Sequence, residues 1–201
     1  MKIIALLKRF SIVAALAGTT LLTGCATTYV DTMTKEVAAS EYRKPTQAKP
    51  VTVSFEFQTN GAPNSRATEF LKAQVTDQLE NSGLFATASG TPGAGQLQVV
   101  LNNVPLQGQN AAAAGFVTGL TFGAVGSTVT DGYVCTISYL PPGQAQPVKV
   151  SARHAIHTTM GASSAPANAQ ESPSMEAAVR KMTRDVVSTA LRDLSNSPNF
   201  N

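Results

Sequence analysis

The clearest pattern along the chain is an alternation of apolar and polar positions over residues 51–57, where two valines and two phenylalanines share one face. Such an alternation is typical of a half-buried β-strand. Three later segments alternate in the same way, over residues 97–102, 128–139 and 148–159. A proline-rich connection joins the last two, and this pair therefore predicts a hairpin.

Residues 65–82 have the period of an amphipathic helix, because their apolar side chains recur at three- and four-residue spacing. Asn64 or Ser65 can cap the start of this helix, and Gly83 is suited to the left-handed conformation that ends it.

A second helix is predicted near the end of the chain. Ser172 is the expected cap and Pro173 the expected first helical residue, and an apolar stripe runs from residue 175 to residue 194. The element order is then β-α-β-β-β-α. It predicts an α+β fold of two layers, a four-stranded sheet with two helices on one face.

The first 24 residues have the composition of an export signal. Basic residues precede an apolar run over residues 10–22, which at about 1.5 Å per residue is too short to span a bilayer core of about 30 Å. The run ends in Leu22-Thr23-Gly24-Cys25, which resembles the lipobox of bacterial lipoproteins. That resemblance implies cleavage before Cys25, acylation of Cys25 and a lipid anchor. The absence of Asp after Cys25 implies the periplasmic face of the outer membrane.

The mature chain divides by composition. Residues 25–50 are polar and carry prolines, so we expect a lipidated flexible tether. Residues 51–195 form the predicted single α/β domain, with a glycine-rich insertion at 108–130, and residues 196–201 are expected to be a polar tail.

A second resemblance lies in the first helix and the residues after it. Phe70-Leu71, Leu79 and Ser82-Gly83-Leu84-Phe85 resemble the first strand-helix unit of envelope proteins with a TolB amino-terminal-like fold. The lipoprotein that assembles lipopolysaccharide at the outer membrane has a similar element order and the same anchor. The resemblance implies a fold and a compartment but no particular function.

The glycine-rich insertion lies in a stretch of 50 residues without a formal charge, between Glu80 and Asp131. Three interpretations compete: a segment that enters the membrane interface, a contact for self-association or multimeric insertion, and a cover for the domain's own core. If it contacts a partner or a membrane, the expected residues are Gly115, Phe116, Gly119, Leu120, Phe122 and Gly123.

Candidate chemistry is sparse. His154 and His157 are three apart on a predicted strand, so they face opposite sides and cannot share a metal ion; we expect His154 inward and His157 exposed. Cys135 is expected to pack as a small hydrophobe. Asp131 is expected at a turn or bulge, and the basic cluster at residues 180–184 on a solvated face.

No phosphate loop, nucleophile elbow or dinucleotide fingerprint is present, so neither an enzyme nor a cofactor or metal site is predicted. Three of the 15 basic side chains lie in the export signal, and the remaining 12 balance the 12 acidic ones. The net charge of +3 therefore gives no support for binding nucleic acid.

The sequence therefore predicts a non-enzymatic accessory or scaffold subunit of an envelope assembly or export complex. Its expected partners are the membrane, through acylated Cys25, and an envelope protein or further copies of itself. The alternative is a periplasmic module that binds a lipid or a glycan.

Overall fold

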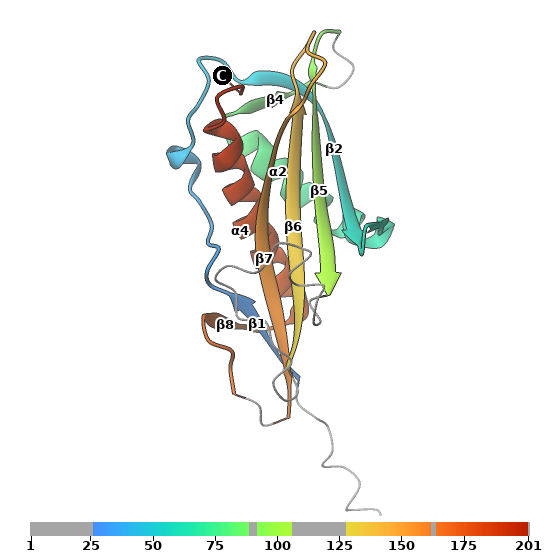
Figure 1. Ribbon diagram of the computed structural model, residues 1–201, viewed down its shortest axis with the longest axis vertical. Helices are drawn as coiled ribbons and strands as arrows, with labels where there is room; N and C mark the ends of the chain where they lie inside the picture. The colour runs from blue at the N-terminus through green and yellow to red at the C-terminus, as the bar shows by residue number, and fades with distance from the viewer. Residues whose placement is uncertain (1–25, 89–91, 106–127, 162–163, 201) are drawn as a thin grey trace, which may run out of the picture.

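The computed structural model describes residues 26–88, 92–105, 128–161 and 164–200 (Figure 1). Within these ranges the strands are β1 (Ala26–Asp31), β2 (Lys49–Thr59), β3 (Ala62–Pro63), β4 (Phe85–Thr87), β5 (Gly95–Pro105), β6 (Thr128–Leu140), β7 (Val148–Met160) and β8 (Ala169–Ser172). The helices are α2 (Ser65–Asn81), α4 (Met175–Ser195) and the 3₁₀ helix η1 (Ala39–Glu41).

The described strands form one mixed sheet of eight strands, in the order β3-β2-β5-β6-β7-β1-β8, with β4 paired to β2. β2 and β5 are parallel and are connected through α2, since parallel neighbours need a crossover connection. From β5 outward, the successive pairs β5–β6, β6–β7, β7–β1 and β1–β8 are antiparallel. The predicted hairpin of β6 and β7 is confirmed, with a register from Thr128 opposite Thr159 to Tyr139 opposite Val148.

The chain is α+β, but the prediction of a four-stranded sheet is wrong. The four segments with alternating patterns correspond to the long strands β2, β5, β6 and β7. Four further strands extend the sheet. β3, β4 and β8 have two to four residues, which is too few to show a period of two. β1 is rich in threonine and shows no apolar face in its sequence.

Residues 26–31, expected in the flexible tether, form β1. This strand pairs with β7 on one side, from Ala26 opposite Met160, and with β8 on the other. Because β1 lies between two strands, its backbone groups are hydrogen-bonded within the sheet. The folded domain therefore begins with the first residue that the structure describes.

Both helices lie on one face of the sheet (Figure 1) and cover the core. Asn64 caps α2 as predicted, accepting a hydrogen bond from the backbone N–H of Ala67 at 3.0 Å. Gly83 follows the helix with φ +69°, the left-handed conformation expected for it. The predicted start of the last helix is wrong by two residues, because Ser172 ends β8 and Ser174 caps α4.

The core lies between the sheet and the helices. Its fully buried members come from β2, β5, β6, β7, α2 and α4, and they include Val51, Leu71, Val75, Leu79, Leu97, Val99, Leu101, Cys135, Ile137, Ile156, Met182, Val186, Leu191 and Leu194. Phe200, in the predicted polar tail, also belongs to this core. Its ring packs against Phe85 and Tyr139 with centroid distances of 5.6 Å. The residues after α4 are thus held against the domain.

Candidate functional site

The predicted contact residues of the glycine-rich insertion (Gly115, Phe116, Gly119, Leu120, Phe122 and Gly123) lie outside the described residues. The predicted lipidation residue, Cys25, also lies outside them. Both assignments stay predictions. The structure does place the residues that flank these positions, namely Ala26 after Cys25, and Pro105 and Thr128 on either side of the predicted contact residues.

Ala26, Thr128 and Met160 lie at one end of the sheet, which we call the basal end. β1 begins there, β6 begins there and β7 ends there, as the pairs Ala26–Met160 and Thr128–Thr159 show. The connection between β6 and β7 lies at the opposite end, because the two strands form a hairpin. The chain thus enters the sheet at the basal end directly after Cys25.

The surface of the basal end carries no charged side chain on its three terminal strand segments, residues 26–28, 128–130 and 158–160. Two apolar side chains are exposed there, Val129 to 38% and Met160 to 50%. Among the described helices, none combines the length and the hydropathy that are needed to cross a bilayer.

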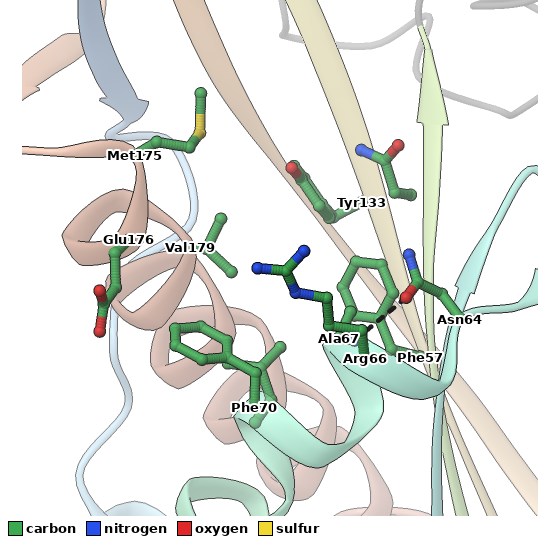
Figure 2. A pocket seen from close by; sticks show the side chains of 11 residues that line it. Phe57, Asn64, Arg66, Ala67, Phe70, Tyr133, Met175, Glu176 and Val179 are labelled. Atoms are coloured by element: carbon green, nitrogen blue, oxygen red, sulfur yellow. Dashed lines mark hydrogen bonds between the residues drawn. The ribbon is translucent and has the colours of Figure 1, made fainter.

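A pocket of about 410 Å³ lies between the N-terminal halves of α2 and α4 and the strands beneath them (Figure 2). This volume is within the range of about 300–1,000 Å³ that is typical of small-molecule sites. Its lining is Phe57 from β2, Asn64 before α2, Arg66, Ala67, Phe70 and Leu71 from α2, Asn103 from β5, Tyr133 from β6, and Met175, Glu176 and Val179 from α4.

The walls of the pocket are mainly apolar. Phe70 and Met175 remain partly exposed, to 37% and 44%, although both are large hydrophobic side chains. The guanidinium carbon of Arg180 lies 4.1 Å from the centroid of the Phe70 ring, and Arg180 Nε donates to Glu176 at 3.2 Å. Arg180, expected on a solvated face, keeps 37% of its side chain exposed and also forms a cation–π contact beside the pocket.

The sheet side of the pocket holds Tyr133 and Asn103, which face each other in the register of β5 and β6. Burial, with a further effect of the Asp131 charge, raises the pKa of Tyr133 above its ordinary value, and a hydrogen bond with Asn103 offsets only part of this. The tyrosine hydroxyl is therefore neutral at physiological pH. Asp131, expected at a turn or bulge, lies within β6 opposite Ile156, and burial raises its pKa.

Arg66 supplies the positive charge of the pocket. It lies in the first turn of α2, and Figure 2 shows its guanidinium extending across the pocket in the direction of Val179. Among the described residues, no acidic side chain forms an ion pair with Arg66. The N-termini of α2 and α4, at Asn64 and Ser174, add the partial positive charge of helix starts.

A buried polar cluster joins α4 to β7 outside the pocket. His154 Nε2 lies 3.2 Å from Asp185 Oδ2, and Lys181 Nζ donates to the same oxygen at 2.8 Å. The backbone N–H of Ala155 donates to His154 Nδ1 at 2.8 Å, which makes Nε2 the nitrogen that donates to Asp185. Burial acts to raise the pKa of Asp185, but the hydrogen bonds from His154 and Lys181 outweigh it and hold the pKa below its ordinary value.

A second histidine cluster lies on the other face of the sheet. Thr130 Oγ1 is 2.9 Å from His157 Nδ1, and His157 Nε2 is 3.6 Å from Asp31 Oδ2. His157 was expected to be exposed, but it is 3% exposed, and β1 beside β7 places Tyr29 opposite the imidazole and Asp31 next to it on this face. This arrangement of a hydroxyl, an imidazole and a carboxylate resembles a catalytic nucleophile with its base. All three side chains are, however, less than a tenth exposed, which denies a substrate access to the hydroxyl.

Cys135 lies in the core of the sheet, as its inward strand position predicts, and is fully buried. Burial raises the pKa of its thiol to about 12. The nucleophile of cysteine chemistry is the thiolate, so this residue is chemically inert in the folded protein.

Neither the pocket nor the buried cluster around Asp185 was predicted from the sequence. Asn103 and Tyr133 meet only through the register of β5 and β6, which no local pattern contains. Asp185 did carry a signal, because it lies three residues after Met182 and one before Val186, on the apolar stripe of the helix. A carboxylate at such a position requires a buried partner.

No protein-family model matches the chain, and no curated protein matches it in sequence. The solved structures that are similar to the chain include the following two. One, from Helicobacter pylori, is assigned as a neuraminyllactose-binding hemagglutinin homolog; it is 14% identical with a TM-score of 0.37, and the match covers 79% of this chain and 88% of that one. The other, from Caulobacter crescentus, is assigned as a lipoprotein; it is 12% identical with a TM-score of 0.30, covering 72% and 84%. Neither likeness is close enough to indicate a function for this chain.

Proposed function

We propose that the protein is a lipid-anchored protein of the cell envelope that acts at the membrane surface as a non-enzymatic accessory subunit. The observation that carries this proposal is the start of β1 at Ala26, one residue after Cys25, where the strand already pairs with β7 and two residues later also with β8. With Cys25 acylated, no spacer separates the lipid from the sheet. The domain is then held directly on the bilayer rather than suspended from a tether.

The basal end supports this orientation. It is free of charged side chains over its terminal strand segments and exposes Val129 and Met160. Apolar side chains at a membrane surface are buried in the boundary between headgroups and acyl chains, where they add to the affinity of a lipid anchor. The residue after Cys25 is Ala26 and not Asp, which supports an outer-membrane location on the periplasmic face.

A non-enzymatic role is supported by the placement of the reactive side chains. Cys135 and the two histidines with their carboxylates are buried, and each described group is engaged in packing or in a polar cluster. The accessory role implies a partner, and an envelope protein or a second copy of the chain is the proposed class.

Replacing Cys25 with alanine tests the anchor. The Cys25→Ala variant is expected to incorporate no radiolabelled palmitate and to be absent from the outer-membrane fraction, because the thiol that carries the diacylglyceryl group is missing. Cys135→Ala, which removes the other cysteine, is the matched control and should keep both the label and the location. Palmitate on the Cys25→Ala variant would refute the assignment of the lipidation site.

A second candidate function is a binding module, and the pocket in Figure 2 is the observation that favours it. Partly exposed apolar walls next to an arginine without an ion-pair partner among the described residues are a typical arrangement for recognising a small ligand. Binding and an accessory role are compatible, since none of the lining residues belongs to the terminal strand segments of the basal end.

A further inference from the structure

We infer that the pocket between α2 and α4 binds a single-chain fatty acid, with the carboxylate on Arg66 and the acyl chain against the apolar walls. This inference rests on the binding-module candidate and names its ligand class. It follows from the charge of the pocket, the polarity of its walls and its position in the sheet.

The charge of the pocket favours an anion. Among the described lining residues, Arg66 is the only cation, and Glu176, the only carboxylate, is already paired with Arg180. The starts of α2 and α4 both contribute partial positive charge. A guanidinium presents two parallel N–H groups that match the two oxygens of a carboxylate, which makes a carboxylic acid a suitable headgroup.

The walls favour an acyl chain over a sugar. Phe57, Phe70, Leu71, Met175 and Val179 present hydrocarbon surface, and two of them stay partly exposed in the free protein. A glycan would bring many hydroxyl groups that need hydrogen-bond partners, and buried polar groups without partners are costly. An acyl chain needs none and would cover the exposed parts of Phe70 and Met175.

The sheet side of the pocket sets the direction of the ligand. Asp131 lies two residues before Tyr133 on β6, so the two side chains are on the same face of the sheet, and the charge of Asp131 would repel a carboxylate placed beside Tyr133. The acid group is therefore expected at the mouth, on Arg66, with the chain directed inward. Tyr133 is five residues along β6 from Thr128, about 17 Å at about 3.3 Å per residue, so the pocket lies in the basal half of the sheet.

Photo-crosslinking tests the ligand class. The acylated full chain is placed in nanodiscs of neutral phospholipid and exposed to a fatty acid that carries a diazirine on its chain. The alcohol and the trimethylammonium compounds of the same chain length serve as comparison probes. We expect the acid to label the peptides that contain Phe70 and Met175 about tenfold more than either comparison probe. The reason is that only the acid can form a hydrogen bond with Arg66 in which both partners are charged, and one such bond changes the affinity by about tenfold.

Variants of α2 and α4 identify the contacts. Arg66→Gln is expected to reduce labelling by the acid about tenfold, while Arg66→Lys, which keeps the charge but not the paired N–H groups, should reduce it less. Lys72→Gln makes the same charge change at an exposed position of α2 outside the pocket, and should leave labelling unchanged. Val179→Trp fills the cavity and should abolish labelling, with circular dichroism verifying that the variant is folded.

The outcomes distinguish a failure of the fatty-acid assignment from a failure of the binding-module candidate. Equal labelling of these peptides by all three probes would overturn the fatty-acid assignment but keep a binding pocket. Unchanged labelling of Arg66→Gln would overturn the carboxylate contact. If no probe labels α2 or α4, both the assignment and the binding-module candidate fail.

Discussion

Asp185→Ala is expected to lower the free energy of unfolding by about 3 kcal/mol, because removing one partner of a buried ionic cluster leaves the others without compensation. Asp185 is 1% exposed and accepts from both Lys181 and His154. Lys181 is partly exposed and can turn to solvent, but His154 is fully buried and keeps a donor without an acceptor. Denaturant unfolding at pH 7 measures the loss.

The loss should depend on pH. The pKa of Asp185 is lowered in the folded protein, so its carboxylate contributes stability above its ordinary pKa of about 3.9. That contribution disappears as the pH falls through the lowered value. The difference between Asp185→Ala and the unchanged protein should therefore shrink at pH 3 relative to pH 7.

Asp193→Ala is the matched control for this experiment. Asp193 lies on the same helix and pairs with Arg192, but both side chains are 40% exposed. An exposed pair contributes at most about 1 kcal/mol, so the control should lose little stability at either pH. An equal and pH-independent loss in both variants would contradict the buried cluster.

Thr28→Pro is expected to destabilise the domain by about 1–3 kcal/mol, because it removes a backbone donor from a strand with neighbours on both sides and leaves a carbonyl unpaired. For a domain of this size the melting temperature should fall by about 2–4 °C for each kcal/mol. Differential scanning calorimetry of the purified protein checks this.

Thr28→Val keeps the backbone N–H and a β-branched side chain, so it should melt within a few degrees of the unchanged protein. Comparing the two variants therefore isolates the effect of the backbone N–H at residue 28. In a flexible tether proline would be tolerated as well as valine. Equal melting temperatures for the two variants would therefore show that β1 is not part of the stable sheet.

The long elements were predictable because their periods are sustained. The strands β2, β5, β6 and β7 and the helix α2 extend over 11 residues or more, and each has a recognisable apolar pattern. β1 was not predictable. Both of its faces are covered by other parts of the fold, so Tyr29, Val30 and Asp31 are all buried and no alternation marks one face.

The wrong prediction for His157 and the failure to predict the pocket have a shared cause, because both depend on strands or strand pairings that the sequence pattern does not reveal. His157 was expected to be exposed because it faces the side opposite to His154, but β1 places Tyr29 opposite it and Asp31 beside it on that face. The candidate pocket depends on contacts between Phe57, Asn103 and Tyr133 on three different strands. Their meeting is set by register, which hydrophobic periodicity fixes only after the strand order is known.

The central claim is that the basal end lies on the bilayer, and fluorescence quenching by headgroup-spin-labelled lipid tests it most directly. A fluorophore is attached to Val129→Cys at the basal end or to Ala145→Cys in the loop between β6 and β7, with the buried Cys135 unreactive. The two positions are separated by most of β6, about 36 Å at about 3.3 Å per residue. Strong quenching at residue 129 and little at residue 145 is the predicted result, and equally weak quenching at both would contradict it.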